Sequence, residues 1–95
     1  MDKEFAHEPE AHRYRVTLDG RLAGVLDYSV LGDAISLHRA YTAPPYRGGG
    51  LAGELVAFAV DDIERTTSLR IVPTCWYVAG WFEEHPERAI LLSAR

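Results

Sequence analysis

The strongest constraint on the fold is a break at residues 43–50, which read Ala-Pro-Pro-Tyr-Arg-Gly-Gly-Gly. Proline cannot donate a hydrogen bond to a β-ladder, so a strand must end at this point. Before the break, apolar and polar residues alternate as in β-strands, whereas after it the apolar residues recur with a helical period. The sequence therefore predicts a β-rich first half and a helical second half, joined by a glycine-rich turn.

The first half is expected to form an antiparallel meander. Strands are predicted at about residues 13–18, 22–31 and 34–42, and Asp19-Gly20 supplies a strong hairpin signal because glycine tolerates positive φ. Residues 1–12 have little periodic apolar content and are expected to be a loosely docked segment, so that residues 13–95 form the single domain. Alternation predicts shared faces for two sets of side chains: Leu22, Leu26, Tyr28 and Val30 in the second strand, and Ile35, Leu37, Arg39 and Tyr41 in the third.

The second half is expected to begin with a helix from Leu51 to about Arg65. A helical crossover would lead into a buried strand at residues 68–72, parallel to its neighbour, and a short amphipathic helix at residues 76–84 would stop at His85-Pro86. Residues 89–92 fit either a short strand or a helical tail. The aromatic side chains expected to cover the sheet are Trp76, Trp81 and Phe82, with the alternative that one of them lines a shallow acceptor cleft. The predicted fold class is thus mixed α/β (α+β).

Composition restricts the function further. Ninety-five residues suffice for one small domain, and 10 Lys+Arg against 14 Asp+Glu give a net charge of −4. This charge weighs against nucleic acid or an anionic membrane as partner. The lone Cys75 cannot form an internal disulfide, and no Cys/His spacing indicates a metal site. With neither a long apolar run nor a basic-then-apolar leader, the expected location is cytoplasmic.

The glycine-rich turn carries the clearest chemical signal. A strand, a glycine loop and a helix in succession commonly bind phosphate, because the first amides of a helix lack internal partners and glycine lets a ligand approach the backbone. Arg47 adds a positive charge beside the loop, and no carboxylate lies between Tyr46 and Gly53. A flexible turn that binds nothing is the simpler alternative. The loop is not a P-loop, because the Gly-Lys-Ser/Thr that a P-loop requires is missing. It is not part of a dinucleotide-binding Rossmann fold, because the chain that follows is too short for the remaining α/β units.

The loop sequence Arg47-Gly48-Gly49-Gly50-Leu51-Ala52 resembles the coenzyme A signature Arg/Gln-x-x-Gly-x-Gly/Ala of the GCN5-related N-acetyltransferases. The segments Pro73-Thr74-Cys75-Trp76-Tyr77 and His85-Pro86 extend the resemblance to the small, YjdJ-like branch of that superfamily, over about residues 13–90. The resemblance implies a minimal GCN5-related fold that uses acetyl-CoA. It implies that the loop amides hold the pyrophosphate and that the strand end offers backbone groups to the pantetheine arm. The implied coenzyme-binding residues are Tyr41, Thr42, Arg47, Gly48, Gly49, Gly50, Leu51 and Ala52.

Three side chains are candidates for the chemistry of acetyl transfer. By the resemblance Cys75 faces the thioester, where it would accept the acetyl group or protonate the leaving thiolate, and Tyr77 could be an acid. His38 could be a base on the strand that leads to the loop. Each residue could instead have a non-catalytic role, with Cys75 a small buried apolar residue, Tyr77 a packing residue and His38 a surface residue. A nucleophilic cysteine needs positive charge nearby to stabilise its thiolate. The cations nearest to Cys75 in sequence are Arg70 and His85, which supply little such charge, so we favour direct attack by the amine over an acetyl-cysteine intermediate.

Acetyl-CoA-dependent N-acetyl transfer to an unidentified amine is therefore the leading functional hypothesis. A non-catalytic CoA- or acyl-CoA-binding module is the alternative, because the chain lacks the extra helices and the C-terminal hairpin that shape the acceptor pocket in larger relatives. An interaction domain with an empty glycine loop is a third possibility. The acidic balance favours a cationic acceptor such as a polyamine or a lysine side chain.

Overall fold

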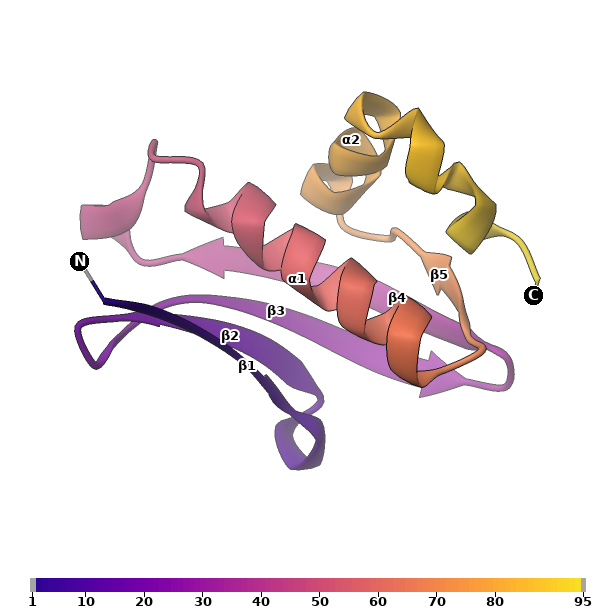
Figure 1. The fold of residues 1–95 in the computed structure, drawn as a ribbon, viewed down its shortest axis with the longest axis horizontal. Coiled ribbons are helices and arrows are strands. Elements are labelled where there is room, and N and C mark those ends of the chain that lie inside the picture. The colour runs from indigo at the N-terminus through magenta and orange to yellow at the C-terminus, as the bar shows by residue number, and fades with distance from the viewer. Residues whose placement is uncertain (1, 95) are drawn as a thin grey trace.

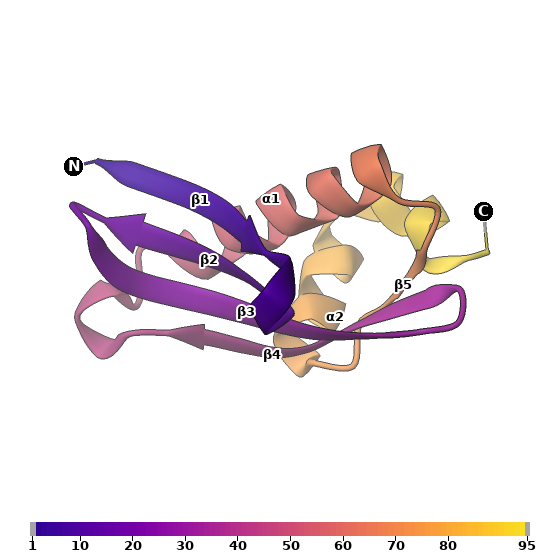
Figure 2. The ribbon, with the colours of Figure 1, turned by 90° about the horizontal axis from the view of Figure 1, so that it is seen from below.

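The computed structural model describes residues 2–94, which form one five-stranded sheet with both α-helices packed on the same face (Figures 1 and 2). Short 3₁₀ turns connect or extend several elements at Pro9–Ala11, Pro44–Tyr46 and Pro86–Leu92. The strands and helices, in chain order, are β1 (Lys3–Glu8), β2 (Arg13–Leu18), β3 (Arg21–Leu31), β4 (Ala34–Thr42), α1 (Leu51–Thr66), β5 (Arg70–Val72) and α2 (Trp76–Glu84).

The sheet has the order β1-β2-β3-β4-β5. The first four strands pair antiparallel as a meander, and β5 pairs parallel with the start of β4, with Ala34–Ser36 opposite Arg70–Val72. Helix α1 is the crossover that makes this parallel pairing possible. The predicted mixed α/β architecture is confirmed. Residues 89–92 take the helical alternative, since they lie in the 3₁₀ turn that ends the fold.

The N-terminal segment differs from the prediction. Instead of docking loosely, Lys3–Glu8 pair along the whole of β2, from Lys3 opposite Leu18 to Glu8 opposite Arg13. Phe5 stacks on Phe58 of α1 with ring centroids 5.4 Å apart, and His7 stacks on Tyr14 at 4.3 Å. The sequence gives no clear strand signal here, because the residues that pack on the core do so by aromatic stacking, partly through a histidine, and do not form the usual alternation of aliphatic and polar residues. Met1, the first residue of the predicted segment, lies outside the described residues.

A bulge in β3 overturns part of its predicted face. Thr17 pairs with Leu22 and Val16 with Gly24, so Ala23 is the extra residue. A bulge shifts the alternation by one position. Leu26 and Tyr28 are therefore buried as predicted, whereas Leu22 on the other side of the bulge is 51% exposed. Val30 is half-exposed because the β3–β4 hairpin extends past the end of α1 (Figure 1).

A second bulge, in β4, makes the prediction of one shared face for this strand wrong. Leu37 pairs with Tyr28 and Arg39 with Asp27, which leaves His38 as the extra residue. Ile35 and Leu37 are buried, but Arg39 and Tyr41 are exposed. The alternation shifts after His38, so that Ala40 packs against the core in their place.

The core lies between the sheet and the two helices. Helix α1 contributes the predicted apolar stripe, with Leu51 buried and Ala52 only half-buried. Trp81 and Phe82 are buried as expected, whereas Trp76 does not cover the sheet and is 84% exposed. Within residues 2–94, no helix combines the length and apolarity needed to cross a membrane.

Candidate functional site

The site begins where β4 and β5 diverge. Beyond the Ser36–Val72 pair, the Cys75 N–H donates to the Leu37 carbonyl (3.0 Å), and the chain then leads away into α2 (Figure 1). The bulge at His38 lies at this point, and bulges increase the local twist of a strand. In the part of the chain that the structure describes, no strand pairs with the outer edge of β4 after Leu37.

Backbone groups of β4 point into the opening. The Ala43 N–H donates to the Ala23 carbonyl (2.8 Å) on the β3 side. Because backbone groups of successive residues point to opposite edges, those of Thr42 and Ala40 point to the open edge. Consistent with this, the Thr42 carbonyl accepts from Arg47 Nε at 2.8 Å.

The glycine loop presents free amides at the start of α1. Gly48 and Gly50 have φ of +88° and +79°, and Gly50 is the N-cap of α1 with no side-chain cap. The first intrahelical bond runs from the Glu54 N–H to the Gly50 carbonyl (3.2 Å), so the amides of residues 51–53 have no partner within the helix. A Cβ placed on Gly48, Gly49 or Gly50 would meet no atom within 4 Å. This is an open, electropositive cradle suited to phosphate.

Charges around the loop favour an anion. The carboxylate of Glu54, the acidic residue in the first turn of α1, is held by Lys3 Nζ at 2.8 Å. The Arg47 guanidinium lies over the Tyr41 ring, 5.6 Å from its centroid, and that of Arg39 lies 5.3 Å from the same centroid. Arg47 is thus fixed through Nε and the ring, while the ends of its guanidinium have no protein partner among residues 2–94. Such a group suits bidentate contact with phosphate.

Two adjoining cavities connect the loop to Cys75. The first, of about 280 Å³, lies over the glycine loop, and the second, of about 310 Å³, lies along the open edge of β4. They share Thr42, Arg47, Ala52 and Tyr77, and we call the two together the loop–strand cleft. Besides the shared residues, Tyr46, Gly48, Gly50 and Leu51 line the first cavity, and Ala40, Tyr41, Cys75 and Trp76 line the second. All the predicted coenzyme-binding residues except Gly49 therefore line one cleft.

Cys75 lies at the far end of the cleft, and Tyr77 lies where its two cavities meet. Cys75 is a free, half-buried cysteine directly before α2, and its carbonyl accepts the Ala79 N–H at 3.0 Å. The Tyr77 hydroxyl packs against the first turn of α1, where a Cβ on Gly53 would approach it to 3.4 Å. Burial, followed by the negative charge of Glu84, raises the pKa of the Tyr77 phenol. Tyr77 is therefore protonated at neutral pH.

His38 is not brought to the cleft. It is exposed at the bulge of β4 and lines neither of the two cavities. Reasoning from sequence also missed Lys3, which pairs with Glu54 from the segment expected to be loose, and Ala40, which the bulge turns toward the cleft. No local signal marks these two residues, because Lys3 meets a helix residue 51 positions along the chain and Ala40 depends on a bulge set by how β3 and β4 align.

Residues 13–91 match the sequence model of a family described as GCN5-related N-acetyl-transferase. The chain belongs to this family. Among the curated proteins, none matches the sequence significantly.

Three solved structures show the same fold. The ribosomal-protein-S18-alanine N-acetyltransferase of Escherichia coli has 21% identity and a TM-score of 0.60, over 77% of this chain and 50% of its own. The ribosomal-protein-alanine N-acetyltransferase of Brucella melitensis biovar Abortus 2308 has 22% identity and a TM-score of 0.56, and the match covers 77% of this chain and 61% of the Brucella chain. The N-acetylglutamate synthase of Neisseria gonorrhoeae, complexed with coenzyme A and N-acetyl-glutamate, has 22% identity and a TM-score of 0.58. That match covers 78% of this chain and 18% of the Neisseria chain. The chain thus spans about half the length of the E. coli enzyme.

Proposed function

We propose that this chain is an acetyl-CoA-dependent N-acetyltransferase. The observation that carries the proposal is the loop–strand cleft, which runs from the free amides of α1, along the open edge of β4, to Cys75. Membership of the GCN5-related family supports it, as does the coenzyme A complex of the Neisseria enzyme, which has the same fold.

The residues of the cleft fit acetyl-CoA in three successive parts. The amides of residues 51–53 and the Arg47 guanidinium would hold the pyrophosphate. The backbone of Ala40 and Thr42 would pair with the amides of the pantetheine arm, as a strand would. The cleft then ends at Cys75, in the cavity that Tyr77 also lines, where the thioester would lie. When bound, acetyl-CoA supplies an activated acetyl group.

The proposed reaction is direct attack by a neutral amine. The amine nitrogen forms a bond to the thioester carbonyl carbon, the C–S bond breaks, and one N–H proton leaves the nitrogen. Tyr77, protonated at neutral pH, would donate a proton to the leaving thiolate, with Cys75 as the other candidate donor, and the proton lost by the nitrogen would restore that donor. No hydrogen bond joins the Cys75 thiol to a basic side chain among residues 2–94, which favours direct attack over an acetyl-cysteine. We assign no step to His38, and the YjdJ-like branch stays a prediction. We also propose a cytoplasmic location.

The test is to add acetyl-CoA and a panel of primary amines to the purified protein and to measure released thiol. Native mass spectrometry of the same preparation detects bound coenzyme. We expect a coenzyme complex and amine-dependent thiol release. A coenzyme complex without release for any amine would favour the non-catalytic CoA-binding module, and the absence of both would refute the proposal.

A further inference from the structure

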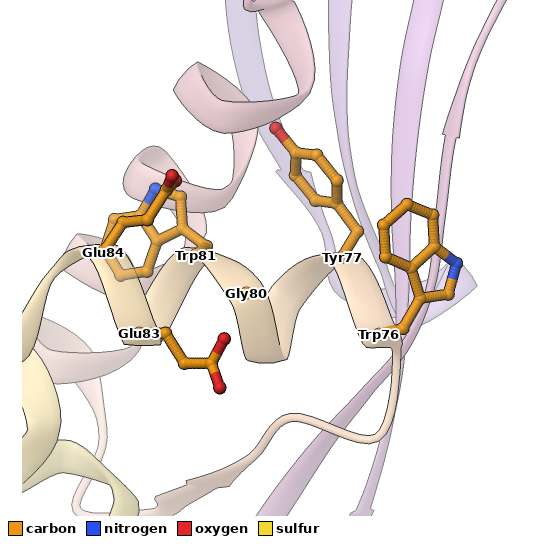
Figure 3. A pocket seen from close by; sticks show the side chains of 6 residues that line it. All are labelled: Trp76, Tyr77, Gly80, Trp81, Glu83 and Glu84. Carbon is orange, nitrogen blue, oxygen red and sulfur yellow. The ribbon is translucent and has the colours of Figure 1, made fainter.

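Helix α2 carries an open groove beside the loop–strand cleft. Its volume is about 280 Å³, and its walls are aromatic, with Trp76 and Tyr77 on one turn and Trp81 on the next (Figure 3). Gly80 lies between these rings, and a Cβ added there would meet no atom within 4 Å. The groove exists because Gly80 has no side chain. Trp76 and Tyr77 also line the cleft at Cys75, so the groove and the cleft meet at these two residues.

The far end of the groove is negatively charged. Glu83 and Glu84 are exposed, and neither forms an ion pair or hydrogen bond with any of the residues that the structure describes. Both lie in the last turn of α2, which has no basic residue, although the helix dipole there favours a cation. The two carboxylates therefore lie at the negative end of the helix dipole, which destabilises α2. A bound cation would offset this repulsion.

The aromatic walls suit the same kind of ligand. Indole and phenol faces attract ammonium groups, while their apolar surface suits an aliphatic chain. Trp81 is held firmly, because its ring stacks on His85 at 4.0 Å and meets Phe82 edge-on at 5.1 Å. By contrast the Trp76 ring is 84% exposed and would gain contacts with a ligand.

The length of the groove sets a spacing between two amines. Glu84 follows Tyr77 by seven residues, which corresponds to about 10 Å along the helix axis. An acceptor that runs along α2 from the backbone of Tyr77 to that of Glu84 would therefore have its two nitrogens about 10 Å apart.

Building on the proposed function, we propose that the acceptor is a linear aliphatic amine with at least two amino groups. Its neutral end attacks the thioester beside Trp76 and Tyr77, and its second, charged end is held beside Glu84 at the far end of the groove. The products are the mono-acetylated amine and the free coenzyme thiol, which receives the proton that the nitrogen loses.

The test compares diaminooctane with octylamine as acceptors at saturating acetyl-CoA. These amines share a chain length, but only the diamine has a second charge. The expected KM of the diamine is about threefold to tenfold lower, as befits one exposed cation site. Gly80→Leu, which fills the groove, and Glu84→Gln should each remove most of this advantage. Leucine is a better helix former than glycine, so Gly80→Leu should fold. Glu87→Gln, which lies outside the groove, is the matched charge control.

Two further measurements separate this proposal from the proposed function. Calorimetry with acetyl-CoA should give the same Kd for Gly80→Leu and wild type, and a loss of affinity would assign the groove to the coenzyme and overturn the proposal. Calorimetry with diaminooctane should show binding to wild type that Gly80→Leu lacks. Equal KM values for the two amines, a preference for a lysine-containing peptide over diaminooctane, or no diamine binding would each overturn the proposal. Failure of acetyl-CoA to bind wild type would instead refute the proposed function.

Discussion

Replacing Tyr14 by phenylalanine should change how the stability of this domain responds to alkaline pH. The Tyr14 hydroxyl donates to Asp62 Oδ2 at 2.7 Å, and its side chain is 1% exposed. Burial, followed by the hydrogen bond and the charge of Asp62, raises the pKa of Tyr14 far above its ordinary value of 10.0. The folded protein therefore keeps the phenolic proton at a pH where the unfolded chain releases it.

The sign and size of the effect follow from proton linkage. Above pH 10 the unfolded state binds fewer protons than the folded state, so the free energy of unfolding falls as the pH rises. Tyr14 alone contributes a loss of about 1.4 kcal/mol at about pH 11. Burial also raises the pKa of Tyr28 and Tyr77, which adds to the wild-type slope. At neutral pH, Tyr14→Phe removes one hydrogen bond to a charged group and should cost about 1.5–3 kcal/mol.

Urea unfolding followed by tryptophan fluorescence at pH 8, 10 and about 11 measures both quantities, with the buried Trp81 as reporter. Tyr14→Phe should start less stable than wild type but lose about 1.4 kcal/mol less by about pH 11. Tyr41→Phe, in which the altered ring is exposed, is the matched control. A wild-type slope in Tyr14→Phe would refute the reasoning.

Two further predictions concern the cleft. Arg47→Ala should weaken acetyl-CoA binding in calorimetry by about 1–3 kcal/mol at low salt and less at high salt, because ions screen a partly exposed contact with phosphate; a loss independent of salt would make Arg47 a structural residue. Cys75→Ala should keep acetyl-CoA binding and lower the rate of thiol release by about tenfold or more if Cys75 assists proton transfer. Wild type incubated with acetyl-CoA alone should show no acetyl adduct at Cys75 by peptide mass spectrometry, and an adduct chased by amine at the turnover rate would establish a covalent route instead.

Local signals in the sequence were enough to predict the elements around the cleft. The prolines and glycines of residues 43–50, the helical period after Leu51 and the stop at His85-Pro86 each act within a few residues, so β4, α1 and α2 lie where they were predicted. The cleft follows from the same signals, because a loop that presents amides depends on its own backbone.

Features that depend on strand pairing could not be predicted in this way. The bulges at Ala23 and His38 are set by how two strands align, and an alternating pattern carries no mark of the extra residue. Strand β1 is stabilised by Tyr14 on the neighbouring strand and by Phe58, which follows far along the chain. Trp76 appeared apolar enough for the core, but as the first residue of α2 it faces the solvent beside the cleft.

The central claim is that the glycine loop holds acetyl-CoA, and calorimetry on two valine variants tests it most directly. Gly50→Val and Gly20→Val impose the same backbone strain, since the two glycines have φ of +79° and +81° and neither has a neighbouring atom within 4 Å of an added Cβ. Gly50 lies in the cleft, whereas Gly20 lies in the turn between β2 and β3. We expect Gly20→Val to bind acetyl-CoA like wild type, and Gly50→Val, folded by circular dichroism, to lose measurable binding. Equal affinity in the two folded variants would contradict the account.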